Sequence, residues 1–281
     1  MSALRFISAM LMLLLAVEVG ARAAQPSDQQ AADWIDEASK SFDEGASVIR
    51  SDRAKAEPLL RRSIESFQRV IAEAGIRNGG LYYNIANAYA LLGDDGRAVL
   101  NYRRAQRFSP SDPNLRANLA LIQDRLPDRV APSSGDRVAQ TLLFWHYDLS
   151  APIRFWIFVG ASGVAWLLGI ARAMGFVRFG VARPMLGLLA VAVLFLGSLA
   201  VDEAASGRTT EAVIVGGPVV GRKGPDVAGY EPSFRDPLHP GVEVRITERR
   251  GEWALVRLAD GRETWLPGES LELLWPLDPA H

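Results

Sequence analysis

The spacing of hydrophobic and polar residues changes along the chain and divides it into regions. Residues 26–126 carry apolar residues at i, i+3 and i+4, which predicts one helix after another. Three stretches, 1–24, 155–171 and 184–201, are predominantly apolar. After Val201, glycine, proline and alternating β-branched residues predict a small all-β region. The pattern therefore predicts a multidomain membrane protein with an all-α part, an apolar helix pair and an all-β part.

Residues 1–24 have the features of a secretory signal peptide. Arg5 gives a basic start, residues 6–17 are apolar, and Ala21-Arg22-Ala23 has the A-x-A spacing of a cleavage site. The run is shorter than the roughly 20 residues that a spanning helix needs. The alternative is an uncleaved N-terminal anchor, which leaves the following residues on the same side of the membrane.

The stretches 155–171 and 184–201 contain no charged residue and are apolar on every face, unlike a surface helix with its polar stripe. We expect transmembrane helices over 152–173 and 183–201. Three arginines and no acid lie in or beside the loop 174–182, whereas two acids follow the second helix. The positive-inside rule therefore predicts a cytoplasmic loop. Both soluble regions then lie in the periplasm, beside the bacterial inner membrane.

Residues 127–151 are expected to form a linker and an interfacial helix. The first ten are rich in proline, serine and glycine without periodicity. The stretch 138–150 contains Phe144, Trp145 and Tyr147, aromatic residues of the kind found at the lipid headgroup level. His146, between them, is expected to be an interface residue rather than a metal ligand.

An internal repeat is present in the helical region, 25–126. Asn84-Ile85-Ala86 recurs as Asn118-Leu119-Ala120 after 34 residues, the period of the tetratricopeptide repeat. Residues of the sizes which that repeat requires stand at Tyr82, Ile85, Ala86, Tyr89, Ala98, Tyr102, Ala105 and Pro110. We expect a solenoid of about two and a half repeats. Its further elements are a helix within 31–48, a lengthened turn over 50–57, and a last helix over 112–126 capped by Asp112 or Ser111.

Such a solenoid binds peptides in the concave groove lined by the first helix of each repeat. The repeat register places Tyr83 and Asn87 in this groove, with Asn84 and Asn118 close by, so these four are the predicted partner-binding residues. The alternative is that the asparagines only satisfy backbone groups of loops or neighbouring helices. Tyr89 and Tyr102 are expected in the core.

A small barrel is expected over residues 207–276, because so short a β region must curl to bury a core. The candidate strands are 211–215, 219–222, 242–248, 253–258, 263–266 and 271–274. Arg250-Gly251 and Asp260-Gly261 supply turn residues between them. Trp253 is expected in the core. Tyr230 and Trp265 are candidates for an exposed aromatic surface, with burial as the alternative.

The order of landmarks in this region resembles the bacterial SH3 domain. The landmarks are Gly224-Pro225, Gly241-Val242-Glu243-Val244, Gly251-Glu252-Trp253 and Asp260-Gly261 followed by Trp265. Thr264 departs from that family, in which glycine usually precedes the tryptophan. The loop 223–240 is also longer than usual.

The whole arrangement resembles the tetratricopeptide-repeat members of the Bacteroides aerotolerance (Bat) operon proteins, the BatE-like group. The stretch NGGLYYNIANAY at 78–89 is particularly similar to that group. The resemblance implies an accessory role beside membrane-anchored von Willebrand factor A proteins and a MoxR-type ATPase, in tolerance of oxidative or envelope stress. It implies no catalytic residue.

The composition further limits the kinds of binding and catalytic site that the chain can form. The 281 residues carry 31 basic and 32 acidic side chains, a balance without the basic footprint of a nucleic-acid-binding protein. The absence of cysteine excludes disulfides, thiolate metal sites and cysteine nucleophiles. The three histidines lie far apart in the sequence, so we expect no metal, no cofactor and no histidine-based triad.

These observations favour an adaptor for protein–protein interaction over an enzyme, because no hydrolase, P-loop or dinucleotide-binding motif is present in a suitable context. The alternative is a cell-wall sensor whose barrel binds peptidoglycan. From Asp202 onward there are nine basic and fourteen acidic residues, a net charge of −5. This charge does not favour a polyanionic ligand.

Overall fold

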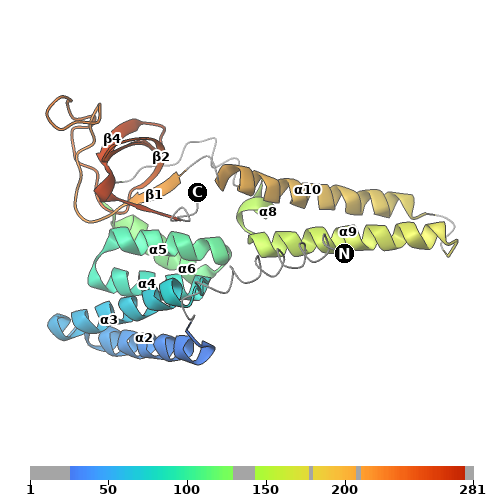
Figure 1. Cartoon of the computed structure of the whole chain (residues 1–281), viewed down its shortest axis with the longest axis horizontal. Coiled ribbons are helices and arrows are strands. Elements are labelled where there is room, and N and C mark those ends of the chain that lie inside the picture. Colours follow the sequence, from blue (N-terminus) through green and yellow to red (C-terminus); the bar gives the residue numbers. More distant parts are fainter. Residues whose placement is uncertain (1–25, 129–142, 177–179, 207–209, 276–281) are drawn as a thin grey trace, which may run out of the picture. The chain divides into compact units, whose positions relative to one another are not determined.

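The structure is a computed structural model that describes residues 26–128, 143–176, 180–206 and 210–275. The expected signal peptide and most of the expected linker lie outside these residues. The chain divides into two compact units, Met1–Arg77 and Asn78–His281. Helices come first along the chain, and a β-sheet comes last (Figure 1).

The first unit contains a hairpin of α2 (Asp28–Val48) and α3 (Arg53–Glu73). Gly45 lets the two helices approach closely, because a Cβ added there would lie 2.9 Å from Leu60 Cγ. The turn is shorter than the expected 50–57, and that prediction is wrong. Asp52 accepts a hydrogen bond from the Lys55 backbone N–H at 3.0 Å, and this cap starts α3 at Arg53.

The second unit begins with α4 (Gly79–Leu92), α5 (Asp95–Phe108) and α6 (Pro113–Arg125). Side-chain oxygens of Asn78, Asp94 and Asp112 cap the three N-termini. Gly93 ends α4 with a left-handed φ of 80°, a conformation that glycine adopts without strain. The predicted helix boundaries between 79 and 126 are therefore confirmed.

The interior of this helical group follows the predicted pattern of large and small residues. Ile85, Ala86 and Ala98 are almost completely buried, as is Tyr102. Tyr89, which was also expected in the core, is only half-buried. It lies in the last turn of α4.

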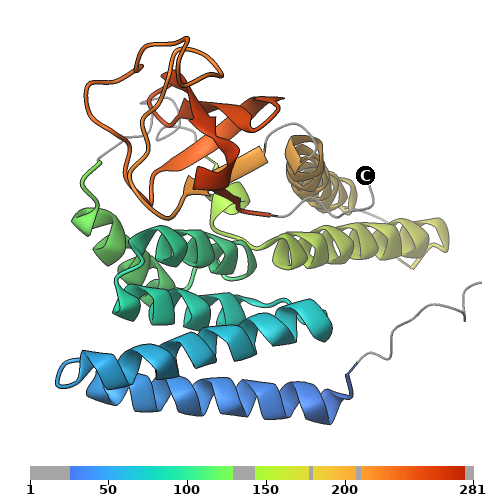
Figure 2. The ribbon, with the colours of Figure 1, turned by 60° about the vertical axis from the view of Figure 1, so that its left-hand side comes forward.

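Three further helices follow, α8 (Phe144–Tyr147), α9 (Ala151–Ala173) and α10 (Ala182–Ser206). The two long ones lie side by side in both views (Figures 1 and 2). Each is long and apolar enough to cross a membrane. Their large apolar side chains, such as Trp156, Trp166 and Leu186, are mostly exposed, unlike those of a soluble core helix. The described part of the expected interfacial helix is a single turn, α8.

The chain ends in an antiparallel sheet of five strands. These are β1 (Thr210–Ile214), β2 (Glu243–Arg250), β3 (Trp253–Leu258), β4 (Glu263–Pro267) and β5 (Leu271–Leu273), in the order β4-β3-β2-β1-β5. Five of the six predicted strands are therefore present. The remaining predicted strand, residues 219–222, forms only isolated bridges to Leu238, Pro232 and Trp265. Prolines in the facing loop lack the N–H donors that a continuous ladder requires.

The sheet buries one face of β3 against its core. Ala254, Val256 and Leu258 are buried there, whereas Trp253 and Leu255 lie on the other face and are half-buried. The prediction that Trp253 belongs to the core is wrong. The alternation along β3 was correct, but the assignment of its two faces was reversed.

Candidate functional site

The predicted groove residues lie on two helices, with Tyr83, Asn84 and Asn87 on α4 and Asn118 on α6. The side-chain amide of Asn118 donates hydrogen bonds to Tyr83 Oη at 3.0 Å and to Asn87 Oδ1 at 3.1 Å. The structure therefore brings three of the four residues into one network. Asn84 is half-buried, and its side chain has no hydrogen bond to any residue that the structure describes.

Tyr102, on α5, also belongs to this hydrogen-bond network. Its hydroxyl donates to Asn87 Oδ1 at 2.6 Å. Burial raises the pKa of Tyr102 to about 12, so the phenol keeps its proton at neutral pH and acts as a donor. Within the described residues, the Asn87 amide nitrogen and the Asn118 carbonyl oxygen remain without a partner.

The network is uncharged, and α4 contains no charged side chain. Fixed amide donors and acceptors without net charge match the C=O and N–H groups of a peptide backbone. They do not match an isolated phosphate or carboxylate, which is normally bound through Arg, Lys or several N–H groups. The arrangement therefore suits an extended peptide segment.

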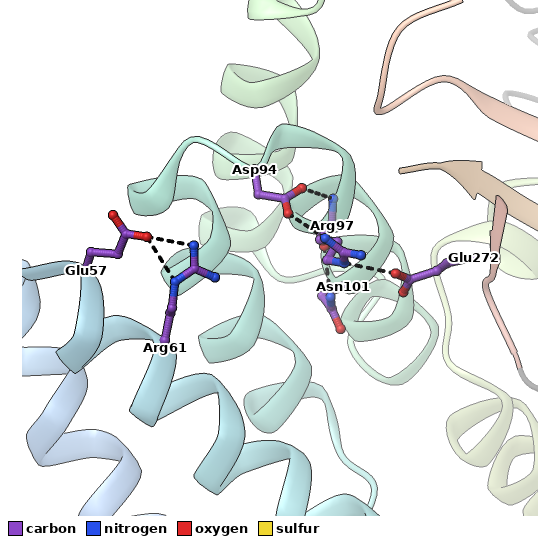
Figure 3. A network of polar contacts seen from close by, with 6 residues as sticks. All are labelled: Glu57, Arg61, Asp94, Arg97, Asn101 and Glu272. Carbon is purple, nitrogen blue, oxygen red and sulfur yellow. Dashed lines mark hydrogen bonds and ion pairs between the residues drawn. The ribbon is translucent and has the colours of Figure 1, made fainter. Parts of the chain in front are cut away.

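A second set of residues, which was not expected from the sequence, joins the helices to the sheet. Arg103 on α5 donates to both carboxylate oxygens of Glu243 on β2, at 2.8 and 2.7 Å. Arg97, which also pairs with Asp94, donates to Glu272 on β5 at 2.9 Å (Figure 3). Side chains of α5 thus reach β2 and β5, the two strands that flank β1.

Arg104 contacts backbone carbonyl groups at the end of the sheet. Its guanidinium donates to the carbonyls of Leu273 and Leu274 at 2.7 and 2.9 Å. Burial lowers the pKa of Arg104, but an arginine remains charged at any physiological pH. The next residue, Trp275, meets Tyr82 and Phe108 edge to face, with ring centroids 6.0 and 5.9 Å apart.

Close backbone contact completes this helix–sheet interface. A Cβ added to Gly96 on α5 would lie 2.9 Å from the Ile214 carbonyl oxygen. A Cβ added to Gly241 would lie 2.7 Å from a methyl group of Leu126. The residues at this interface are separated by more than 100 positions, so no local pattern could have indicated that they meet. The only available signal was the run of arginines on α5.

A third set lies where α8 meets the two apolar helices. Arg154 on α9 is 5% exposed, donates to Ser198 Oγ at 2.7 Å, and also donates to the Asp202 carboxylate. His146 Nδ1 lies 2.8 Å from the same Ser198 Oγ. His146 Nε2 lies 3.4 Å from Asp202 Oδ1. The contacts of His146 with Ser198 and Asp202 were not predicted, because these two residues lie about fifty positions away in the sequence.

Serine, histidine and aspartate are the residue types of a hydrolase triad, but their surroundings give no support for catalysis. Ser198 is 8% exposed, and Arg154 donates to its hydroxyl oxygen at hydrogen-bond distance. A nucleophile needs access to substrate and an oxygen free to attack. The described residues also contain no group of three or more acidic or histidine side chains able to hold a metal ion.

Only one of the two candidate aromatic residues in the sheet region is exposed. Tyr230 is 47% exposed and its ring rests on Gly224. Trp265 is 7% exposed, so it is not a surface residue, and the alternative of burial is the one observed. Its strand bridges to Arg222, and the Arg250 guanidinium lies 5.3 Å from its ring centroid.

Thr264, which departs from the SH3 pattern, has a structural role. It is buried, and its hydroxyl lies 3.2 Å from the Arg222 carbonyl oxygen and 2.9 Å from Ser233 Oγ. Gly221 leaves room for it, since a Cβ there would collide with the threonine side chain. Thr264 thereby holds the start and the middle of the long loop against β4.

Comparisons with protein-family models, with curated proteins and with solved structures give no match to this chain.

Proposed function

We propose that the protein is an inner-membrane adaptor that presents a peptide-binding helical region to the periplasm. In this proposal the helices form a tetratricopeptide solenoid, the sheet is an SH3-like barrel, and α9 and α10 span the membrane as a hairpin. The described residues support the coarser features: paired helices, two apolar helices and a small antiparallel sheet.

The observation that carries the proposal is the contact between α5 and the sheet. The helices precede the two apolar helices in the chain, and the sheet follows them. Parts joined by the Arg103–Glu243 and Arg97–Glu272 pairs must lie on one side of a membrane. An even number of spans between them satisfies this requirement, and one span would not. The arginine-bearing loop favours the periplasmic side for both parts.

The partner is a protein that offers an extended, uncharged segment to the network of Tyr83, Asn87 and Asn118. Its amide groups would pair with the unpartnered side-chain groups of this network. The resemblance to the Bat operon proteins suggests the partners themselves: membrane-anchored von Willebrand factor A proteins, acting with a MoxR-type ATPase. The function is then recruitment in an aerotolerance or envelope-stress complex.

Cysteine labelling tests the topology directly, because the chain contains no cysteine of its own. The test uses the exposed positions Leu121, Glu231 and Met174, each replaced singly by cysteine. In spheroplasts, an impermeant maleimide is expected to label L121C on α6 and E231C in the sheet region. M174C, between the apolar helices, should react only after permeabilisation. Labelling of M174C in intact spheroplasts would overturn the topology.

Photo-crosslinking tests the adaptor role in the full-length protein. Benzoylphenylalanine at position 83 is expected to capture a protein partner in native membranes, whereas the same probe at the exposed Val227 should not. N118A should reduce the yield at position 83 at least severalfold, because the amide network is lost. N114A, an exposed asparagine on the same helix, is the matched control. Equal yields in N118A and N114A would count against this groove.

No observation in the sheet region favours the cell-wall sensor. Of the two candidate aromatic residues on which a glycan ligand would stack, Trp265 is buried and only Tyr230 is exposed. The polar cluster at His146 likewise gives no reason to propose an enzyme.

A further inference from the structure

The one-turn helix α8 has a polar contact on each side. Asp148, which follows α8, accepts a hydrogen bond from Arg116 on α6 at 2.8 Å. On the other side, His146 reaches Ser198 on α10 and lies 3.1 Å from Arg154 Nη1 on α9. His146 and Asp148, two residues apart at the C-terminal end of this turn, therefore connect the peptide-binding helices with the apolar helices.

The second contact is unusual because it buries a charge between two apolar helices. Arg154 and Ser198 are 5% and 8% exposed. Arg154 Nε has no hydrogen-bond partner among the described residues, so the guanidinium is held by its two terminal nitrogens. A charge buried in this way is strongly unfavourable unless it is paired, and Asp202 provides the pair. Ionisable residues in apolar helices of this kind usually have a specific role.

The geometry also fixes the orientation of the His146 ring. Arginine is only a donor, so His146 Nδ1, which lies beside Arg154 Nη1, accepts. The proton of the neutral ring is then on Nε2, which faces Asp202 Oδ1. Each ring nitrogen therefore has a charged neighbour of the matching polarity, and α8 is held in one orientation against α9 and α10.

We propose that α8 is a strut that sets the position of the peptide-binding helices relative to the membrane. Arg154 is its positioning residue, since it fastens His146, Ser198 and Asp202 together at the end of the apolar pair nearest α8. This inference rests on the proposed membrane hairpin. It adds that the groove on α4 and α6 is held in place rather than tethered by a loose linker.

The test measures the proximity of α6 and α8 in the full chain. R116C/D148C replaces the ion pair by two cysteines in a protein with no others, and a short bismaleimide reports their proximity in membranes. With the cluster intact, efficient intramolecular crosslinking is expected. H146A in this background should reduce the yield at least about threefold, because it removes the ring without leaving an unpaired buried charge.

R154Q/D202N provides a second variant, because it removes both charges of the buried pair together. This variant is expected to be present at the same level as the parent protein and also to give a low crosslinking yield. R172Q, which removes an exposed arginine from the other end of α9, is the matched control and should crosslink fully. Undiminished crosslinking in both H146A and R154Q/D202N would overturn the strut. Failure of the membrane hairpin itself would instead appear as external labelling of M174C.

Discussion

Arg103 of α5 holds the carboxylate of Glu243 on β2 through two hydrogen bonds, although the residues are 140 positions apart. The same carboxylate accepts a hydrogen bond from Gln123 on α6 at 3.1 Å. One side chain of the sheet therefore binds two helices at once. Two-point geometry and partial burial make such a pair stronger than a typical surface ion pair.

R103A is expected to lower the free energy of unfolding by about 1–2 kcal/mol, because it removes a bidentate pair and leaves Glu243 half-buried. Urea denaturation of the purified full-length protein in detergent measures the change. R61A is the control, since Arg61 pairs with Glu57 on the exposed surface of α3 (Figure 3). That pair contributes roughly 0.3–0.5 kcal/mol. Equal losses for R103A and R61A would show that the Arg103–Glu243 pair contributes no more to stability than an exposed ion pair.

G96A and G80A are expected to have opposite effects, although both glycines are the second residue of a helix. A Cβ at Gly96 would lie 2.9 Å from the Ile214 carbonyl oxygen and 2.9 Å from Pro240 Cβ, so α5 must move away from the sheet. We expect a loss of roughly 1–3 kcal/mol. The site at Gly80 is open apart from the Asn78 side chain, so alanine should be neutral or stabilise by up to roughly 1 kcal/mol. Thermal unfolding of the two variants gives the comparison.

T264A is expected to release the loop 223–240 from β4. The variant loses the hydroxyl that contacts the Arg222 carbonyl and Ser233, which should destabilise the sheet by about 1–2 kcal/mol. Limited proteolysis should cut this loop several times faster than in the parent protein. T247A removes a threonine hydroxyl that bonds to the Leu255 carbonyl on the exposed side of the sheet. If T247A accelerates cleavage as much as T264A, the proposed fastening is wrong.

The burial of Tyr102 predicts a pH dependence of stability. Its pKa is about 12 in the folded protein and about 10 in an unfolded chain. Between these values the unfolded state binds fewer protons, so stability falls as pH rises above 10, by up to about 1.4 kcal/mol per pH unit. Y102F should lack this component, while losing about 1 kcal/mol at neutral pH with the hydrogen bond to Asn87.

The measurement compares denaturation midpoints of Y102F and the parent protein from pH 8 to 11.5. The difference between them cancels the titration of all other groups. We expect the parent protein to lose its advantage of about 1 kcal/mol as pH rises above 10, so that the two curves converge and then cross before pH 11.5. Parallel curves would show that the Tyr102 hydroxyl titrates alike in both states.

Local signals explain why the helices and strands were predictable from the sequence. Asp112 caps α6, Gly93 ends α4, and glycine turns bound β3, and each of these acts within a few residues. The repeat period also brought Asn87 and Asn118 together correctly, because a repeat fixes spatial neighbours from spacing alone.

The wrong predictions concern side chains whose burial or contacts depend on residues far away in the sequence. Alternation in β3 gives two faces but not which one is covered, so Trp253 was assigned to the wrong one. Trp265 is buried, and it contacts Arg222 and Arg250, which lie outside its own strand. The Arg154 cluster escaped notice because Asp202 was read only as the flank of a helix. Its four members come from three helices, and no spacing rule connects them.

The interface between α5 and the sheet has a consequence for how the molecule is made. Ribosomes complete α5 long before they reach Glu243 or Glu272, and both apolar helices are produced in between. Until then no strand is present to bind Arg97, Arg103 and Arg104. The face of α5 that later contacts the sheet remains exposed to water or to a chaperone. Because closure joins segments that are so distant in the chain, it should be a late and slow step of maturation. Truncation before the final strand would leave Arg97 and Arg104 without their partners on β5.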